Sequence, residues 1–382
     1  MPLSDVIRNS RALLCLDCGK CTGICPVARF NRSYSPRSLL NRALRGVNSE
    51  LLKDKNIWNC LTCKLCDEQC PADIDYITLT QAIRSEANKL GEEALCSHGG
   101  AAQSLMRIMS SPNLIPKRMD WIDKNLKISE NGDTLYFVGC APFFDVLFSD
   151  IGVTPTNTAN SAIKILNFLG INPVLLRDER CCGHDLLWQG DFENFKKLAL
   201  YTIEAIKKSG AKKIVFSCPE CYRTFKIDYS KYFDFKIEMF HISEIVAQAI
   251  GEKKIKFNGV ERNITFQDPC RLGRHLRIYD EPRTIMNTIP KLTLREMRHS
   301  KNRAICCGVS AWMNCSNYSK RLQIMRLKEV KETGADLLVT ACSKCEIHFN
   351  CAMKETPEAQ RAEDIKIEVK NLVDLIAEAI EG

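Results

Sequence analysis

The chain has 382 residues, of which 45% are hydrophobic and 26% are charged, and its formal net charge is +8. This length and composition indicate a soluble globular protein of two to four domains. They exclude a membrane-spanning chain, because no apolar run reaches the roughly 18 residues that a spanning helix needs. Residues 1–15 lack the apolar core of a secretory signal. We therefore expect a cytoplasmic protein that is peripheral to a membrane only through a partner.

Cysteine is the unusual component, with 21 residues. A secreted disulfide framework would use that many, but nothing targets this chain to an oxidising compartment. The cysteines also fall into C-x-x-C groups and CC pairs, which indicate metal sites. Metal-bound cysteines are thiolates, and two cubane centres would remove about four units of positive charge. The positive formal net charge therefore does not indicate nucleic-acid binding, and we expect no nucleic-acid partner.

The pattern of residues 1–95 predicts a helical domain. Leucine, alanine and valine recur at helical spacing over 36–52, and Pro36 stands where a first helical turn would begin. Residues 74–90 also have a helical pattern, which ends at Gly91. A compact bacterial ferredoxin would put short strands and turns here instead. Residues 96–133 follow as a polar, partly helical connector.

Two cysteine runs in this first domain match C-x2-C-x2-C-x3-C-P at every defined position, beginning at Cys15 and Cys60. In this motif three closely spaced thiolates bind one cube and the fourth completes the other cube. The alternative, a pair of zinc knuckles, explains neither the third cysteine nor the x3-C-P ending. We therefore predict two cubane [4Fe–4S] clusters with crossed ligands. The predicted ligands are Cys15, Cys18, Cys21 and Cys70 for one cluster, and Cys60, Cys63, Cys66 and Cys25 for the other. This segment resembles the helical ferredoxin domains of multi-subunit oxidoreductases.

The rest of the chain is an internal repeat. LYFVGC at 135–140 answers ITFQDPC at 264–270, and ERCCGH at 179–184 answers AICCGV at 304–309. The offsets of the matching cysteines are 130, 125 and 124 residues, so the register is kept. The repeat predicts two equivalent domains, 134–255 and 256–382.

Each half alternates short β-branched or aromatic runs with helical patterns. In the first half we expect strands at 134–139, 173–177, 213–217 and 236–240, and helices near 157–169, 190–209, 221–231 and 242–250. This alternation predicts α/β domains with parallel sheets. Most of the cysteines follow a strand, so we expect them at the carboxyl edge of each sheet, where open α/β folds place their ligands.

Each half carries one cysteine, then a CC pair followed by glycine, then C-x2-C. The residues are Cys140, Cys181, Cys182, Cys218 and Cys221 in the first half, and Cys270, Cys306, Cys307, Cys342 and Cys345 in the second. Gly183 and Gly308 follow the CC pairs, and a residue without Cβ lets the backbone approach a bulky inorganic core.

This constellation resembles the signature of the CCG-domain family, and the resemblance covers essentially the whole chain. That family includes the catalytic subunits of methanogen heterodisulfide reductases and the iron–sulfur subunits of several flavin-linked dehydrogenases. The resemblance implies a noncubane [4Fe–4S] centre on the five cysteines of each half. Five thiolates exceed what one cubane needs. The alternative is a conventional cubane with one spare cysteine in each half.

The resemblance implies an iron–sulfur oxidoreductase that reduces a heterodisulfide of the coenzyme M–coenzyme B type at the ten catalytic cysteines of the paired centres. Electrons would come through the two cubanes from a redox partner, either a b-type cytochrome in the membrane or a flavoprotein. The alternative is an electron-transfer subunit of a flavin-dependent 2-hydroxyacid or glycerol-3-phosphate dehydrogenase. No Gly-rich dinucleotide fingerprint follows a strand, so flavin or nicotinamide chemistry would belong to another chain.

Charged side chains near the cysteines are candidates for binding a disulfide substrate. Anionic groups bind arginine forks, and the candidates are Arg180, Arg271, Arg274 and Arg298. His184 and His348 are candidate proton donors. The alternatives are solvated surface charges for the arginines and packing or capping roles for the histidines. Cys96, Cys315 and Cys351 remain outside the four sets, and by default they are small hydrophobes.

Overall fold

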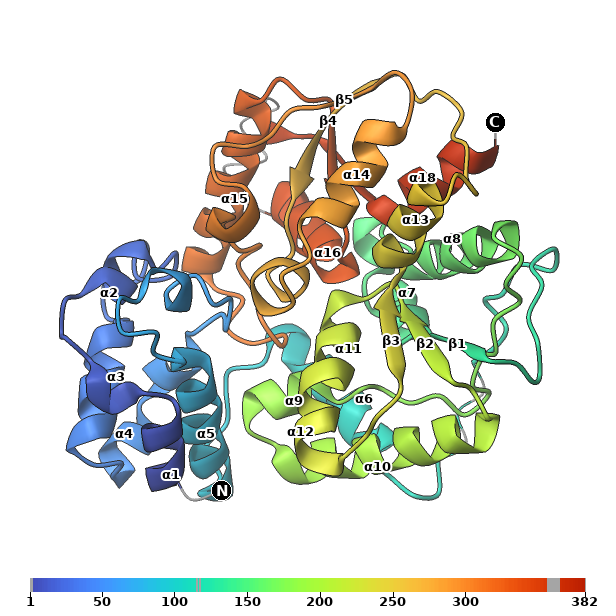
Figure 1. The fold of residues 1–382 in the computed structure, drawn as a ribbon. Coiled ribbons are helices and arrows are strands. Elements are labelled where there is room, and N and C mark those ends of the chain that lie inside the picture. The colour runs from blue at the N-terminus through green and yellow to red at the C-terminus, as the bar shows by residue number, and fades with distance from the viewer. Residues whose placement is uncertain (1–2, 115, 117, 356–364, 382) are drawn as a thin grey trace.

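The structure is a computed structural model that describes residues 3–114, 116, 118–355 and 365–381. Figure 1 shows a small helical domain, in blue, beside two α/β units. The helices of the small domain are α1 (Leu3–Asn9), α2 (Lys20–Ile24), α3 (Pro36–Arg45), α4 (Ser49–Lys53) and α5 (Tyr76–Lys89). The predicted helix over 36–52 is two helices, because the chain turns at Gly46, whose φ is 130°. A connector with α6 (Ala101–Met109) leads to the first α/β unit.

The first α/β unit contains a parallel sheet in the order β1-β2-β3. Its strands are β1 (Thr134–Phe137), β2 (Lys213–Phe216) and β3 (Glu238–His241). The predicted strand over 173–177 is wrong, since Val174 forms only isolated parallel bridges, with Leu135 and with Ser129. Val174 exchanges hydrogen bonds with the backbone of β1, but the next N–H on that side of the strand, that of Val138, donates to the Glu179 carboxylate.

Seven helices surround this sheet among the described residues. They are α7 (Ala141–Leu147), α8 (Pro155–Phe168), α9 (His184–Gln189), α10 (Phe192–Ser209), α11 (Pro219–Arg223), α12 (Ser230–Phe233) and α13 (Ile242–Gly251). The predicted helices near 157–169, 190–209 and 242–250 are confirmed as α8, α10 and α13. The one near 221–231 is α11 and α12, which are joined by a π-helical turn at Thr224–Tyr229.

The second α/β unit contains a parallel sheet in the order β5-β4-β6-β7. Its strands are β4 (Arg262–Gln267), β5 (Leu292–Leu294), β6 (Leu337–Thr340) and β7 (Glu368–Asn371). Its helices are α14 (Asp280–Thr288), α15 (Asn317–Glu332), α16 (Ser343–Glu355) and α18 (Leu372–Glu381). With Val174 counted beside β1, the two sheets have the same order, so the predicted α/β repeat with parallel sheets is confirmed.

The two halves exchange their last helices. Helix α18 of the second half packs on α8 of the first, and α13 of the first half packs on α14 of the second (Figure 1). Thr158 on α8 donates a 2.7 Å hydrogen bond to the Asp374 carboxylate on α18. Residues of all four helices belong to one continuous apolar core. This exchange fixes the carboxyl ends of the two sheets toward each other.

The helical domain is attached to the first α/β unit through a buried arginine. The Arg84 guanidinium on α5 donates to the carbonyls of Ile57, Trp58 and Cys60, and to that of Trp188 on α9. Gly190, directly after α9, has a φ of 88°, and a Cβ there would collide with the backbone carbonyl of Arg84. Only glycine lets these two backbones approach so closely.

We expect Gly190→Ala to lower the thermal unfolding midpoint more than Gly210→Ala does. Gly210 ends α10 with a φ of 70°, and a Cβ added there would meet no atom within 4 Å. The control variant therefore loses only the left-handed preference, about 1–2 kcal/mol. Gly190→Ala adds a backbone collision, about 1–3 kcal/mol more. Thermal unfolding of both variants is followed by circular dichroism. Equal unfolding midpoints for the two variants would contradict the packing described.

Candidate metal centres

The two cysteine runs of the helical domain share one backbone geometry. After Cys15 the left-handed residues are Asp17 and Gly19, and after Cys60 they are Thr62 and Lys64. The backbone N–H of Asp17 lies 3.4 Å from the Cys15 sulfur, and that of Thr62 lies 3.3 Å from the Cys60 sulfur. Both loops thus aim backbone donors at thiol sulfurs, which favours the thiolate forms that bind metals.

The fourth cysteine of each run lies beside the first three of the other. Burial raises the pKa of the Cys21 thiol, and the nearby Cys15 and Cys70 add to the rise. Burial likewise raises the pKa of Cys25, and Cys63 and Cys60 add to it. The structure therefore brings together the residues of each predicted crossed set. Cys66 also lines the pocket that Cys15, Cys18, Cys21 and Cys70 form. The assignment of ligands to clusters stays a prediction.

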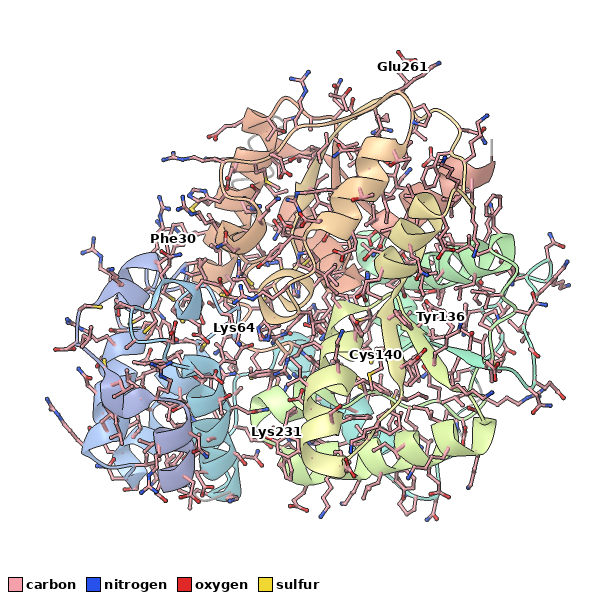
Figure 2. All side chains as sticks on the ribbon, in the orientation of Figure 1. Phe30, Lys64, Tyr136, Cys140, Lys231 and Glu261 are labelled. Atoms are coloured by element: carbon pink, nitrogen blue, oxygen red, sulfur yellow. The ribbon has the colours of Figure 1, made fainter. Side chains whose placement is uncertain are left out.

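The five cysteines of the first α/β unit come together at the carboxyl end of its sheet. Cys140 follows β1 and Cys218 follows β2. The sulfurs of Cys140 and Cys181 lie 3.4 Å apart, and Cys182 hydrogen bonds with both Cys181 and Cys221. Figure 2 marks Cys140 near the middle of the molecule, where the two α/β units meet.

Glu179 ties the strand end that carries Cys140 to the loop that carries the CC pair. Its carboxylate accepts from the backbone N–H groups of Val138 and Gly139, at 3.1 and 2.8 Å. Burial raises the pKa of Glu179 to about 7, although Arg118 lowers it. Arg118 donates to the carbonyls of Glu179 and Gly139 and so links the same strand end and loop a second time.

The second α/β unit repeats this arrangement. Cys306 hydrogen bonds with Cys270 and Cys307, and Cys345 hydrogen bonds with Cys307 and Cys342. The Nδ1 atom of His348 lies 3.2 Å from the Cys307 sulfur. His348 thus contacts a predicted ligand, and its role as a proton donor stays a prediction.

Each set of five thiols fits an iron–sulfur group. Hydrogen bonds from neighbouring thiols lower the pKa of two thiols in each set. These are Cys182 and Cys218 in the first set, and Cys270 and Cys307 in the second. The pKa of each remaining thiol is raised. Five buried thiolates at such separations repel one another unless a cationic core lies between them. The donor set therefore matches the thiolate chemistry of such clusters.

The glycines after the CC pairs are explained by packing. Gly183 has a φ of 79°, and a Cβ there would lie 2.8 Å from Phe195. Gly308 has a φ of 93°, and a Cβ there would lie 3.1 Å from the Ser319 carbonyl. These glycines therefore allow a left-handed turn against a neighbouring helix. This role takes the place of the expected one, which was to make room for an inorganic core. Gly139 is the glycine close to the thiols, since its Cβ would lie 2.9 Å from the Cys221 sulfur.

Three of the four candidate arginines are buried and bonded to the protein itself. Arg271 donates to the Thr62 carbonyl at 2.5 Å, and Arg274 donates to the Cys63 carbonyl at 2.5 Å. Arg180 donates to the carbonyls of Met109, Ser111 and Leu114. These contacts favour a structural role. Arg298 is exposed, and anion binding by the four stays a prediction.

The second set also contacts the helical domain. A hydrogen bond with Cys306, together with the charges of Arg274 and Arg271, outweighs burial and lowers the pKa of Cys63 to about 6. Cys63 is a predicted cubane ligand and Cys306 a predicted ligand of the second five-cysteine set. The two sets are therefore neighbours, across a boundary that Arg271 and Arg274 hold together.

A buried polar cluster lies between the two five-cysteine sets. The Lys344 ammonium from the second unit lies 2.6 Å from Asp185 and 2.5 Å from Glu220 of the first. Burial lowers the pKa of Lys344, but the two carboxylates raise it well above its ordinary value. Lys344 also lines a pocket with Cys140, Cys181, Cys182, Cys218 and Cys221. The second half thus places a cation in the site of the first.

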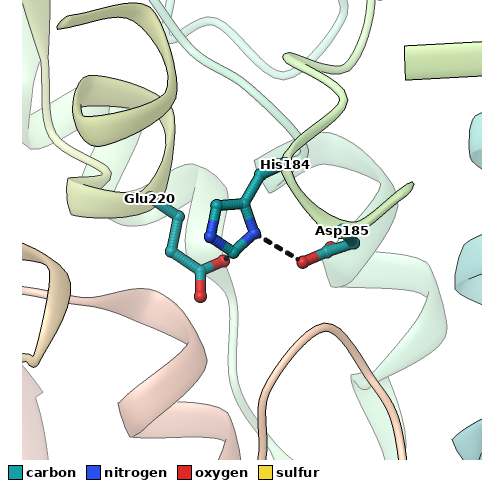
Figure 3. A group of neighbouring side chains, drawn as sticks. All are labelled: His184, Asp185 and Glu220. Carbon is teal, nitrogen blue, oxygen red and sulfur yellow. Dashed lines mark hydrogen bonds and ion pairs between the residues drawn. The ribbon is translucent and has the colours of Figure 1, made fainter. Parts of the chain in front are cut away.

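His184 belongs to the same cluster (Figure 3). Its Nδ1 lies 2.8 Å from Asp185, and its Nε2 lies 3.1 Å from the Nε–H of Arg271. Burial lowers the pKa of His184 well below its ordinary value, as do Arg271 and Lys344. The imidazole is therefore neutral, donates from Nδ1 to Asp185 and accepts at Nε2. This geometry favours a positioning role, and the expected role as a proton donor stays a prediction.

The sequence reasoning missed Lys344, Glu220 and Asp185. Glu220 lies inside Cys218-Pro-Glu-Cys221, and Lys344 occupies the equivalent position inside Cys342-Ser-Lys-Cys345. The aligned repeats therefore carry opposite charges at matched positions. This difference in charge was the feature of the sequence that could have indicated an ion pair between the two halves. The pKa of Cys342 is raised because burial, Glu220 and Cys218 outweigh a hydrogen bond with Cys345. The two C-x-x-C segments face each other.

We expect Lys344→Met to destabilise the protein strongly, because it leaves two buried carboxylates without their cation. Breaking a buried ion pair in this way costs about 3–5 kcal/mol. Glu220→Gln is the matched control, since Lys344 keeps its bond to Asp185. Thermal unfolding followed by circular dichroism compares the two. A Lys344→Met midpoint no lower than that of Glu220→Gln would contradict the account.

Two family models match the chain. The model described as a 4Fe-4S dicluster domain matches residues 11–74. The model described as a cysteine-rich domain matches twice, over residues 134–226 and 264–350. The matches together cover more than half of the chain and include the predicted cysteine sets.

The chain is similar along nearly its whole length to one of the subunits of dihydromethanophenazine:CoB–CoM heterodisulfide reductases. Identity is 29% with the Methanosarcina barkeri protein and 27% with the Methanosarcina mazei protein, over 96% of this chain and 93% of each relative. One subunit of a fumarate reductase (CoM/CoB) from Methanothermobacter marburgensis is 24% identical over 95% of this chain and 71% of the relative.

Among solved structures, a hypothetical protein from Helicobacter pylori shares the fold. Its TM-score is 0.54 at 11% identity, over 92% of this chain and 69% of that chain. Within the described ranges, the helices are all too short or too polar to cross a membrane.

Proposed function

The chain belongs to the cysteine-rich (CCG) domain family of iron–sulfur oxidoreductases, and we propose that it reduces a heterodisulfide of the coenzyme M–coenzyme B type to two thiols. The proposal includes two noncubane [4Fe–4S] centres on the five-cysteine sets, and two cubane clusters that supply the electrons. Its coenzyme specificity follows from the heterodisulfide reductases that the chain resembles.

One observation carries the proposal. Lys344 and Glu220, which lie inside the two C-x-x-C segments, form a 2.5 Å ion pair. This contact sets the two five-thiol sets opposite each other across one buried polar cluster. A disulfide yields two thiolates on reduction, and two opposed metal-binding sets offer one place for each. When bound, the clusters supply one-electron carriers with affinity for sulfur.

The polar cluster supplies a fixed positive charge and hydrogen-bond donors. Lys344 carries an ammonium with three donors, held by Asp185 and Glu220 at 2.6 and 2.5 Å. It lines the pocket of the first set. His184 and Arg271 hold Asp185 in place through the hydrogen bonds described above. We propose that the Lys344 ammonium donates a hydrogen bond to a product thiolate and stabilises its charge, that the two protons of the reduction come from solvent, and that the cluster positions the substrate.

The electron path would begin at the helical domain. Cys18 is exposed, and Leu13, Leu14 and Leu16 around it are 65%, 52% and 68% exposed. We propose that a redox partner, a b-type cytochrome or a flavoprotein, contacts this surface on the cytoplasmic side. The set with Cys63 lies next to Cys306, so the second α/β unit would receive electrons before the first.

We expect Cys182→Ser and Cys307→Ser each to abolish heterodisulfide reduction, because both halves must contribute a sulfur-binding set. Reduction of the clusters in the helical domain should survive, since their predicted ligands lie within residues 15–70. The assay is single-turnover cleavage of the disulfide by pre-reduced protein under anaerobic conditions. Cys96→Ser is the matched control, because Cys96 lies outside all four sets.

Undiminished heterodisulfide reduction by either variant would contradict the two-set mechanism. It would favour instead an electron-transfer subunit of a flavin-dependent 2-hydroxyacid or glycerol-3-phosphate dehydrogenase. The cluster content of each variant is measured alongside by visible absorption. This measurement distinguishes a variant that has misfolded from one that has lost only a catalytic group.

A further inference from the structure

A basic cavity lies outside the proposed centres, between the helical domain and the second α/β unit. Its volume is about 540 Å³, which is within the range of small-molecule sites, about 300–1,000 Å³. One wall is the loop with Arg29 and Phe30, and the other is helix α15. In Figure 2, Phe30 lies at the edge of the blue domain that faces this helix.

Four cationic side chains line the cavity: Arg29, Arg298, Arg321 and Lys328. Within the part of the chain that the structure describes, none of the four forms an ion pair or a side-chain hydrogen bond. Two carboxylates also line the cavity, Glu329 and Glu332. Glu329 is already bonded to Arg326, at 2.6 Å, and to His299, at 3.1 Å. The cavity therefore carries uncompensated positive charge.

Two of the arginines, both exposed, lie near one aromatic ring. The guanidinium carbon of Arg321 lies 5.0 Å from the centre of the Phe30 ring, and that of Arg29 lies 6.0 Å from it. Lys328 follows Arg321 by two helical turns, so both lie on one face of α15. Two guanidinium forks and an ammonium suit phosphate or carboxylate groups.

Apart from His299, the remaining lining is apolar. Phe30, Ile305, Ile324 and Met325 contribute it, so the cavity can also hold a short hydrocarbon portion. Its walls are close in sequence to predicted cluster ligands, since Arg29 follows Cys25 and Ile305 precedes Cys306. A bound anion would contact both domains at this boundary.

We propose that this cavity is a binding site for a small molecule with at least two phosphate or carboxylate groups and a short apolar portion. The proposal does not depend on which disulfide the protein reduces. Binding of such an anion relieves the repulsion among the four cations and joins the helical domain to α15.

Isothermal titration of the full-length, cluster-loaded protein with pyrophosphate, and separately with citrate, tests the site. The titrations are made at low ionic strength, because salt screens exposed charges. We expect saturable binding of at least one probe, and about tenfold weaker binding in Arg321→Gln and in Lys328→Gln. Lys331→Gln is the control: it removes one charge from the same helix outside the cavity, and binding should not change.

The two probes identify the chemistry. Binding of pyrophosphate alone assigns the site to phosphates, binding of citrate alone assigns it to carboxylates, and binding of both supports the shared anion site. Two results would overturn the proposal: no saturable binding of either probe, or binding that Lys331→Gln weakens as much as the cavity variants do. The titrations involve no turnover, so they remain informative if heterodisulfide reduction is not the activity.

Discussion

The ion pair between Lys344 and Glu220 is the contact on which the proposed site depends. Both groups are nearly fully buried, so their removal from water costs several kcal/mol each, and only close pairing offsets that cost. Asp185 adds a second carboxylate, and His184 holds Asp185 in place. The pair joins two segments that are 124 residues apart in the sequence.

The two halves are equivalent in fold but not in chemistry. The second half contacts the Cys63 loop of the helical domain, through Arg271, Arg274 and the Cys63–Cys306 pair. The first half instead receives the lysine of its partner half. His348 contacts Cys307 in the second half, whereas the equivalent position in the first half is Thr224. The two halves thus share one arrangement of five cysteines, but one half contacts the helical domain and the other receives a buried ammonium.

The sequence predicted most of the fold, because the fold follows from repeated local patterns, and the grouping of the cysteines into ligand sets stays a prediction. The repeat in cysteine spacing and the strand–helix alternation indicated the α/β units, and the x3-C-P ending anticipated that Cys25 lies near Cys60. The failures came from contacts distant in sequence. Nothing near Arg271 or Arg274 indicated that their forks would bind carbonyls of Thr62 and Cys63. The Glu179 carboxylate takes the Val138 N–H that the expected fourth strand would have used, and the glycines after the CC pairs pack against helices. The charges of Glu220 and Lys344 became meaningful only when the structure placed them face to face.

The central claim is that four cysteine sets, two in the helical domain and one in each α/β unit, hold four iron–sulfur centres. Quantitative iron analysis of anaerobically purified protein, combined with Mössbauer spectroscopy, tests it most directly. The account predicts about sixteen iron atoms per chain, in four four-iron centres of two spectroscopic kinds. About eight iron atoms per chain, with only cubane signals and fully loaded helical-domain clusters, would contradict it.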